Sequence, residues 1–318
     1  IDHDRGNLNK ISLQALTLAR KLATDSGVGL ESALIGEEAQ GLAQELQQYG
    51  VSKVHLVKHE QLSDYAPEAW AESLVQLCKA QNATMLIAPG TERGNEVLAY
   101  VAAKLNLPMA ANCAAVKAGE SFELTRIRWG GSLLEDAKLS GDIKLFSVAP
   151  HIISAEVAPA SNLVINEITP ELSSKAFRVK IARRDMTAGD KVSLTDAKLV
   201  VSGGRGVGSP EGFKPLEELA SLVGGAVGCS RAVTSHGWRP HSDQVGQTGA
   251  RVAPTLYIAC GISGAIQHLI GCKGAKHILA INTDKDAPIV TKADYAVIGD
   301  LHEILPAISA ELKKQGYA

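Results

Sequence analysis

Two glycine-rich turns in the second half of the sequence have the composition of phosphate-binding loops. The first lies between Gly203 and Ser209 and the second between Gly261 and Gly264, and each follows an apolar run and precedes a predicted helix. Glycines allow backbone N–H groups to approach an anion at the start of a helix. Ser209 stands where the dinucleotide fingerprint has a third glycine or alanine. An ordinary tight turn, and a helix N-cap for Ser263, therefore remain alternatives.

A polar loop interrupts the apolar sequence between these turns. It reads Gln-Val-Gly-Gln-Thr-Gly from Gln244 to Gly249, a poor helix or strand but a good source of amide and hydroxyl donors. Such donors could surround the hydrogen-bonding edge of a flat heterocycle, while Ser230 and Arg231 add a hydroxyl, a charge and a planar surface. A plain solvent-exposed loop is the alternative.

The composition restricts the class of protein. The chain has 318 residues, 45% hydrophobic and 21% charged, with a net charge of -2, which indicates two folded domains rather than a disordered chain. The basic excess of a nucleic-acid-binding protein is missing, so no nucleic-acid partner is expected.

One uncharged window in the sequence has the length of a membrane span. The window between Arg251 and Lys273 is long enough to span a bilayer, but Pro254, Gly261 and Gly264 interrupt it. We therefore expect no membrane insertion.

Cysteine and histidine spacing gives no metal or disulfide signal. The five cysteines form no C-x-x-C pair, which favours a reducing compartment. His236, His241 and Asp243 lack the spacing of known metal ligands, so no metal site is predicted. No targeting signal is recognisable at the start of the sequence, although a removed leader, or a strand before Ile1, would be compatible with it.

The scaffold for these residues is predicted to be an α/β fold in two domains. In the first, residues 1–190, apolar runs alternate with segments of helical period, which is typical of βαβ units and a parallel sheet. Short strands after residue 110 predict an antiparallel extension, followed by a connector with some β character at 155–195. The predicted helices are 8–24, 37–49, 67–81 and 92–105; the strands are 30–35, 53–57, 84–88, 123–129 and 144–148.

The second domain, residues 191–318, is predicted to be a Rossmann-like doubly wound parallel sheet. Both glycine-rich turns would then lie at the carboxyl edge of this sheet, where open α/β sheets bind ligands. The predicted strands are 198–202, 226–229, 256–260, 277–281 and 295–298, with helices starting near 210 and at 264–271 and 301–314.

Taken together, these motifs resemble the alpha subunit of electron-transferring flavoproteins. The resemblance covers residues 197–312 nearly continuously and is looser over the first 190 residues. Its most specific parts are Q-V-G-Q-T-G at 244–249 and G-I-S-G-A-I-Q-H at 261–268, in this order. The resemblance implies one FAD, held mainly by the second domain, and a beta subunit that completes the flavin pocket and carries AMP.

The matching positions also imply a role for each site residue. Arg231 would lie over the isoalloxazine, His268 at N1 and C2, and Thr248 near N5, which together would favour an anionic semiquinone. Ser230 and Gln247 would also surround the ring. Along the diphosphate and its linker would lie Arg205, Gln244, Gly246, Ser263, Gly264 and Gln267, with Asn282 and Asp300 toward the adenosine half; Val245, Gly249 and Gly261 belong to the same segments.

The function implied by the resemblance is electron transfer rather than the conversion of a substrate. Donors would be acyl-CoA dehydrogenase-type flavoproteins, as in fatty acid oxidation, and the acceptor a membrane quinone oxidoreductase. The location would be the cytoplasm of a bacterium or the mitochondrial matrix of a eukaryote. Three alternatives remain: a bifurcating variant with a second FAD, an adenine-nucleotide-binding regulatory protein, and an NAD(P)-binding oxidoreductase domain, against which the missing acidic residue after the second strand counts.

Overall fold

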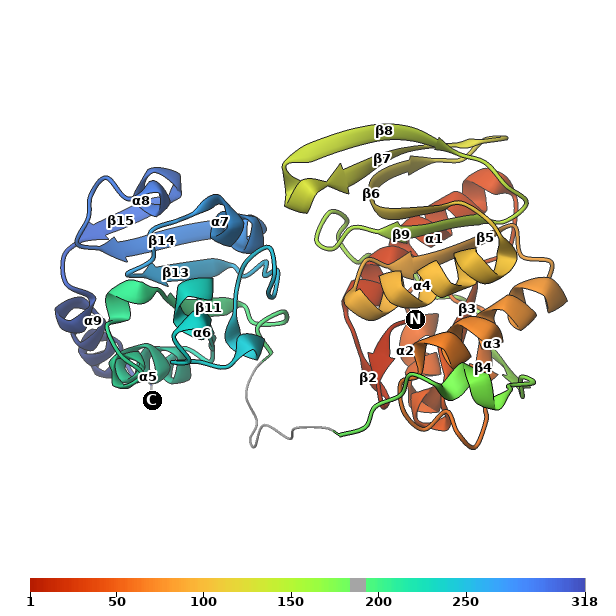
Figure 1. Ribbon diagram of the computed structural model, residues 1–318, viewed down its shortest axis with the longest axis horizontal. Helices are drawn as coiled ribbons and strands as arrows, with labels where there is room; N and C mark the ends of the chain where they lie inside the picture. Colours follow the sequence, from red (N-terminus) through yellow and green to blue (C-terminus); the bar gives the residue numbers. More distant parts are fainter. Residues whose placement is uncertain (184–192, 318) are drawn as a thin grey trace. The chain divides into compact units, whose positions relative to one another are not determined.

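The chain folds into two compact units, Ile1–Met186 and Thr187–Ala318. The computed structural model describes residues 1–183 and 193–317 (Figure 1). The boundary predicted between residues 190 and 191 lies outside the described residues.

The described part of the N-terminal unit contains two sheets of three or more strands. One is parallel throughout, in the order β10-β4-β3; the other has the order β5-β9-β6-β7-β8, with β5, β9 and β6 parallel and β7 and β8 antiparallel. A short hairpin of β1 and β2 precedes them. The strands are β1 His3–Asp4, β2 Asn7–Leu8, β3 Glu31–Ile35, β4 Lys53–Val57, β5 Met85–Pro89, β6 Met109–Lys117, β7 Phe122–Arg128, β8 Leu133–Leu139, β9 Lys144–Val148 and β10 Val164–Ile168.

This arrangement confirms the predicted α/β class with its antiparallel extension, and it differs from the prediction in the number of sheets and in several elements. The parallel strands are divided between two sheets because β3 and β5 do not pair with each other. The predicted strands 53–57 and 144–148 coincide with β4 and β9. No separate strand was predicted for β6, β8 or β10; β6 is rich in alanine and carries Asn112, a composition with low β propensity.

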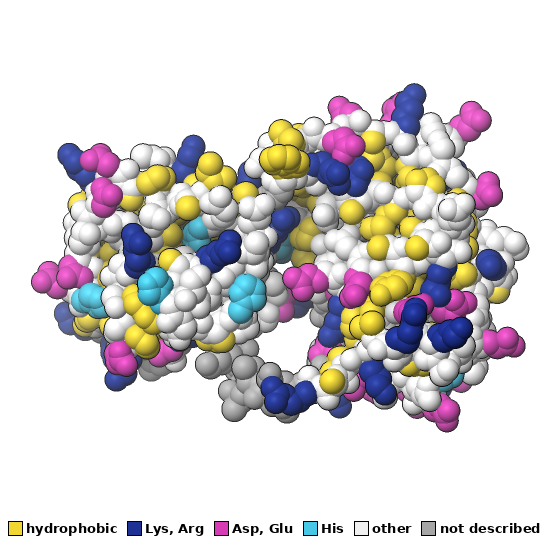
Figure 2. All heavy atoms as spheres, in the orientation of Figure 1, with side chains coloured by type: hydrophobic (Ala, Val, Ile, Leu, Met, Phe, Trp, Pro, Cys, Tyr) yellow, Lys and Arg dark blue, Asp and Glu magenta, His cyan; other side chains and the backbone are white. Residues whose placement is uncertain are grey.

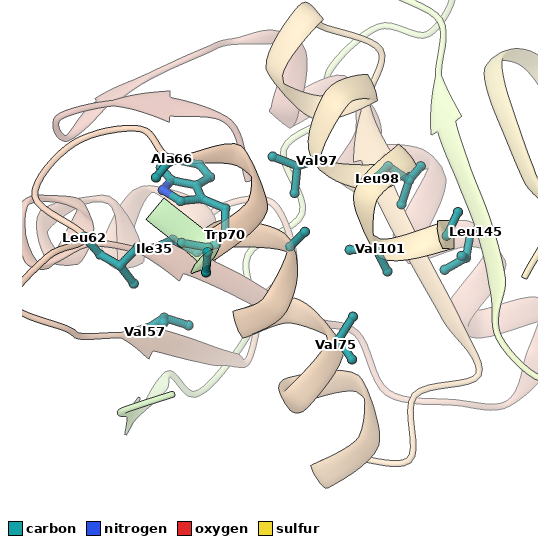
Figure 3. Packing of buried hydrophobic residues seen from close by; sticks show 14 residues of the cluster. Ile35, Val57, Leu62, Ala66, Trp70, Val75, Val97, Leu98, Val101 and Leu145 are labelled. Carbon is teal, nitrogen blue, oxygen red and sulfur yellow. The ribbon is translucent and has the colours of Figure 1, made fainter. Parts of the chain in front are cut away.

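Four α-helices cover these sheets: α1 Ile11–Ser26, α2 Ala43–Gln47, α3 Pro67–Ala80 and α4 Glu92–Leu105. Pro67 occupies the first position of α3, and the Thr91 hydroxyl caps α4 by accepting from the Gly94 N–H at 3.0 Å. The first half of the helix predicted at 37–49 is a 3-10 turn, Glu37–Leu42. In the core, side chains of α3 and α4, among them Trp70 and Val101, pack together with Ile35 of β3 (Figure 3).

The C-terminal unit is a five-stranded parallel sheet in the order β12-β11-β13-β14-β15. Its strands are β11 Leu199–Gly203, β12 Ala226–Cys229, β13 Leu256–Cys260, β14 His277–Asn282 and β15 Tyr295–Ile298. Its helices are α5 Lys214–Leu222, α6 Arg231–Ser235, α7 Ile266–Cys272, α8 Pro288–Lys292 and α9 Leu301–Lys314.

Helices cover both faces of this sheet, as the Rossmann-like prediction requires. Successive strand residues point to opposite faces, so Val201 packs in one core with Leu216 and Leu305, while Val200 packs in another with Cys272 and Ile289. The first core lies under α5 and α9 and the second under α7 and α8. The doubly wound α/β fold is thereby confirmed.

Membrane spans and metal clusters were also sought among residues 1–183 and 193–317. No helix in this part of the chain is long and apolar enough to cross a bilayer, and the uncharged window after Arg251 divides into β13, a turn and the seven-residue α7. Nor does this part contain a group of three or more His, Cys, Asp or Glu residues that could hold a metal ion. All five cysteines are buried and free.

Candidate functional site

The two glycine-rich turns meet at one point of the C-terminal sheet. They follow β11 and β13, which are neighbours in the sheet although β12 lies between them in the sequence. The Gly204 N–H donates to the Cys260 carbonyl at 2.8 Å, and the Gly206 N–H donates to the Gly261 carbonyl at 3.0 Å. The chain order reverses between these strands, so the turns form the carboxyl edge of a topological switch point, where open α/β sheets bind ligands.

The close approach of the turns requires glycine. A Cβ atom at Gly204 would lie 2.3 Å from the Gly261 carbonyl oxygen, and one at Gly206 would lie 2.8 Å from the Gly261 Cα. Gly261 and Gly264 have positive φ angles of 60° and 84°, and a Cβ at Gly264 would lie 2.3 Å from the Ile289 nitrogen. A side chain at Gly204 or Gly206 would push the two turns apart, and one at Gly264 would push the second turn away from α8.

The second turn presents unused backbone donors. Among the residues that the structure describes, the N–H groups of Ile262, Ser263 and Gly264 donate no hydrogen bond. Successive free N–H groups beside left-handed glycines form an anion-binding concavity. The Arg205 side chain, in the first turn, is exposed and adds a positive charge to this edge. The turns therefore suit a phosphate or diphosphate group.

The polar loop is held in place by the buried amide of Gln244. This side chain is 2% exposed; its Oε1 accepts from the Thr234 hydroxyl at 2.7 Å, and its Nε2 donates to the Thr248 hydroxyl at 3.0 Å. The amide is thus engaged within the protein, whereas the Thr248 side chain is exposed. In this arrangement the Gln244 amide holds the hydroxyl of an exposed Thr248 in place.

Backbone bonds connect the same loop to β12 and α7. The Val245 N–H donates to the Cys229 carbonyl at 2.8 Å, and the Gln247 N–H donates to the Gln267 carbonyl at 2.7 Å. A Cβ at Gly249 would lie 2.3 Å from the Gln244 carbonyl oxygen, so the turn that closes the loop also requires glycine. Gln247 and Gln267, which are twenty positions apart in the sequence, come together at the site with exposed side chains.

Ser230 and Arg231 join this edge through the end of β12. The Ser230 N–H donates to the Gly203 carbonyl at 2.9 Å, which places Ser230 beside the first turn. Ser230 is buried and precedes α6, and Arg231 is its first residue. The Arg231 guanidinium is exposed and forms no ion pair with any residue in the described ranges, so its charge is available to a ligand.

His268 points into the protein. Its ring is 6% exposed, and its Nε2 lies 2.8 Å from the hydroxyl of fully buried Tyr257. Burial lowers the pKa of His268 to about 4, so the imidazole is neutral near pH 7. Its Nδ1 has no hydrogen bond of normal geometry to a described residue. When the Tyr257 hydroxyl donates to Nε2, the imidazole proton is on Nδ1, and the nearby Val245 backbone partly offsets the effect of burial on the pKa of His268.

Asn282 and Asp300 lie farther along the carboxyl edge and have local partners. The Asn282 Nδ2 donates to the Ile262 carbonyl at 2.9 Å, so Asn282 supports the second turn directly. Asp300 caps α9 by accepting from the His302 N–H at 2.8 Å. It follows β15, which β14 separates from β13. The structure thus brings the turns, Ser230, Arg231, the polar loop and Asn282 together and places Asp300 two strands away from the second turn.

Thr234 and Tyr257 belong to this network but were not singled out from the sequence. Thr234 binds the Gln244 amide, and Tyr257 binds His268. A sequence signal exists for Tyr257, because a tyrosine within an apolar strand needs a partner for its buried hydroxyl. None marks Thr234, whose role depends on where the polar loop folds back onto α6.

Comparisons with known proteins cover both units. Residues 1–173 match the family described as electron transfer flavoprotein domain, and residues 193–273 match the electron transfer flavoprotein FAD-binding domain. An electron transfer flavoprotein subunit alpha from Thermoanaerobacterium thermosaccharolyticum is 36% identical over 97% of this chain and 95% of its own length. The subunit alpha from Bacillus subtilis is 36% identical (97% and 94% covered), and protein FixB from Clostridium saccharobutylicum is 35% identical (97% and 93%).

Proposed function

Because this chain belongs to the electron transfer flavoprotein alpha-subunit family and carries its FAD-binding domain, we propose that it passes electrons from acyl-CoA dehydrogenase-type flavoproteins to a membrane quinone oxidoreductase. The observation that carries this proposal is the meeting of two glycine turns at the switch point, beside a rim of amide, hydroxyl and guanidinium groups. When bound there, FAD supplies reversible one-electron and two-electron chemistry.

The described residues fit a flavin dinucleotide. The diphosphate would lie in the cradle formed by Gly204, Gly206 and Gly261, and would accept hydrogen bonds from the free N–H groups of Ile262 to Gly264. The exposed Arg205 would balance its negative charge. Asn282 holds the second turn in position through the Ile262 carbonyl.

The ring system would lie against the polar loop, where three groups favour added negative charge. Arg231 contributes a permanent positive charge, and the Thr248 hydroxyl is held by the buried Gln244 amide. His268 contributes a neutral donor at Nδ1, because its pKa near 4 excludes a charged imidazole at pH 7. Such an environment stabilises a flavin that carries one extra electron and no extra proton.

A partner subunit is part of this proposal. By family membership, a beta subunit would complete the flavin pocket and carry a structural AMP. The compared relatives are bacterial, which supports a location in the bacterial cytoplasm. The chain itself would transform no substrate, and its rate of electron transfer would depend on how closely a donor approaches the flavin ring.

The test is co-purification with the beta subunit, followed by an absorption spectrum, a flavin count and a nucleotide count. We expect a yellow heterodimer with one FAD and one AMP, whose flavin is reduced anaerobically by an acyl-CoA dehydrogenase with its substrate. A second FAD, reduced by NADH, would indicate the bifurcating variant. A colourless complex that binds NAD(P) would indicate the nicotinamide alternative, and a colourless complex that binds only AMP or ATP a regulatory protein.

A further inference from the structure

The connector between Arg231 and Gln244, residues 232–243, contains little regular structure of its own. It consists of the rest of α6, which has five residues in all, a bend at Gly237 with φ 70° and a 3-10 turn at His241–Asp243. A helix of this length forms too few backbone hydrogen bonds to be stable by itself. The positions of Arg231 and of the polar loop therefore depend on contacts between the connector and the rest of the C-terminal unit.

Arg239 ties the connector to two carboxylates. Its side chain is 14% exposed; its Nε donates to Asp243 Oδ2 at 2.9 Å, its Nη2 lies 2.8 Å from the same oxygen, and its Nη1 donates to Glu217 of α5. Burial by itself would lower the pKa of Arg239, but Glu217 and Asp243 more than offset burial and raise it, so the guanidinium stays charged. The planar fork of donors suits a contact with two groups at once, which a lysine ammonium could not reproduce.

The same guanidinium reaches the first glycine-rich turn through an aromatic ring. Its Cζ lies over the ring of Phe213, 5.2 Å from the ring centroid. Phe213 is 1% exposed and packs against the residue that begins the turn, because a Cβ at Gly203 would lie 2.5 Å from the ring. A guanidinium above an aromatic face is a favourable contact when both groups are shielded from water. One ring therefore connects Arg239 with the backbone of the first turn.

On its other side, Arg239 holds the residue that precedes the polar loop. Asp243 is followed directly by Gln244, whose buried amide bonds to the hydroxyls of Thr234 and Thr248. A displacement of Asp243 would thus displace Gln244 and, with it, the Thr248 hydroxyl. We call the following four residues the Arg239 clamp: Phe213, Glu217, Arg239 and Asp243.

We propose that Arg239 is a positioning residue of the flavin site, because it joins Phe213, beside the first turn, to Asp243, before the polar loop. The clamp fixes how far Arg231 and the Thr248 hydroxyl lie from the diphosphate-binding turns, and through this distance it sets the potential of the first electron added to the flavin. Arg239 acts through geometry rather than through its own charge, which two carboxylates already offset. The inference rests on the proposed FAD site.

Two substitutions with opposite changes of charge separate position from charge. Arg239→Gln removes a positive charge, Asp243→Asn removes a negative one, and each breaks the clamp. Both should lower the potential of the first electron, by about threefold or more in the equilibrium constant, since the groups that stabilise added negative charge move away. A direct effect of charge would instead give shifts of opposite sign. Stepwise anaerobic reduction of the heterodimer measures these shifts, and opposite signs would overturn the proposal.

A second pair of variants identifies the group through which the clamp acts. In an Arg231→Ala background, Arg239→Gln should shift the potential less, because one of the side chains that the clamp positions is missing. Lys313→Gln is the control: it removes an ion pair of 2.6 Å between α9 and Glu218, the neighbour of Glu217 on α5. An undiminished shift in the Arg231→Ala background, or an equal shift in Lys313→Gln, would contradict the proposal.

The flavin-free chain tests the clamp without reference to the flavin. Cys229, at the end of β12, is buried, and burial together with the charge of Asp243 raises its pKa to about 12, so the thiol should react slowly. We expect Arg239→Gln and Asp243→Asn alike to speed amide exchange at 236–249. Alkylation of Cys229 should also be faster in both, by about tenfold or more, while the buried Cys78 of the N-terminal unit reacts at its former rate.

The combined results separate failure of this inference from failure of the proposed function. Flavin bound with an unshifted potential in both variants would overturn the inference alone, as would unchanged amide exchange at 236–249. A heterodimer of the unsubstituted chain that binds no flavin would overturn the proposed function, and the inference with it. Arg239→Lys keeps the charge but loses the fork and the flat face, so it should show part of each effect; behaviour equal to that of arginine would contradict a role for geometry.

Discussion

At the scale of single residues, the positive charge of Arg231 is the feature to test first. This side chain follows β12, is exposed, and forms no ion pair with any residue that the structure describes. Arg231→Ala should lower the potential of the first electron added to the flavin by about 60 mV, a tenfold change in the equilibrium. Stepwise anaerobic reduction of the heterodimer, followed by absorbance, measures both the potential and the amount of the one-electron state. Arg205→Ala is the control, expected to weaken FAD binding more than it shifts the potential. An unchanged potential in Arg231→Ala would remove this residue from the proposed mechanism.

His268 and Tyr257 should act as a pair. Removing the Tyr257 hydroxyl deprives Nε2 of its partner at 2.8 Å, so the imidazole loses the contact that keeps its proton on Nδ1. We expect Tyr257→Phe and His268→Asn to lower the first potential in the same direction, and the double variant to lower it by less than the sum. Gln267→Ala, at the exposed neighbour, is the control. Additive shifts would show that the two side chains do not act together.

The buried imidazole also makes a prediction for stability against pH. The pKa of His268 is about 4 in the folded chain and 6.5 in the unfolded chain, so the unfolded state binds the proton first as the pH falls. Above pH 6.5 the group has no effect; between pH 6.5 and 4 it reduces the free energy of unfolding by up to about 3 kcal/mol. Urea unfolding at several pH values should show that the free energy of unfolding falls less on acidification in His268→Gln than in the unchanged chain. His277→Gln, at an exposed position, should follow the unchanged chain.

At the scale of elements, the site depends on the distance between two turns. Gly204→Ala places a methyl group where the Gly261 carbonyl oxygen now stands 2.3 Å away, so the turns must separate. We expect FAD affinity to fall at least tenfold and the free energy of unfolding to fall by roughly 1–3 kcal/mol. Equilibrium dialysis of FAD and thermal unfolding measure the two effects. Gly41→Ala is the control, since a Cβ there has no neighbour within 4 Å; a matching loss in that variant would refute the steric explanation.

Local sequence signals predicted several elements with the bounds that the structure gives them. The predicted helix 92–105 coincides with α4, whose first turn the Thr91 hydroxyl caps, and the predicted strand 53–57 coincides with β4. Strand β6 lacks such signals: its run of alanines depends on pairing with β7 and β9 for its conformation. Alternation of apolar runs located the parallel strands β3, β4, β5 and β9. It did not predict the parallel strands β6 and β10, or that β3 and β5 do not pair with each other.

For the site, the sequence predicted that the two turns lie at one edge of the sheet, but not how the donor side chains are oriented. The order of strands and turns predicted that the two turns lie at the carboxyl edge of the sheet, since strand ends determine that edge. The position of the polar loop follows from its bonds to β12 and α7. The inward positions of Gln244 and His268 depend on hydrogen bonds to Thr234 and Tyr257. These two partners lie outside the motifs and reach them only in the folded chain. That Gln244 acts on the flavin through the Thr248 hydroxyl, and His268 through its own Nδ1, stays a prediction.

At the scale of the whole molecule, the two units match different family domains. The FAD-binding family domain covers residues 193–273, whereas residues 1–173 match a separate electron transfer flavoprotein domain. In the N-terminal unit, hydrophobic side chains gather at the end of the β7–β8 hairpin (Figure 2). Trp129 is 80% exposed and Leu134 is 72% exposed, and Leu133 beside them is also exposed. Large apolar side chains grouped in this way on a surface usually mark a protein interface.

The proposed beta subunit is the partner that we expect to cover this hairpin end. An aromatic side chain with neighbouring leucines has the composition of an interface hot spot, where one truncation costs ~2 kcal/mol or more. Trp129→Ala should therefore weaken association with the beta subunit at least tenfold in titration calorimetry while leaving Tm of the isolated chain unchanged, because the side chain makes little contact in its own unit. Val28→Ala, an exposed apolar residue away from the hairpin, is the matched control. Equal affinity in both variants would place the beta subunit elsewhere on the chain.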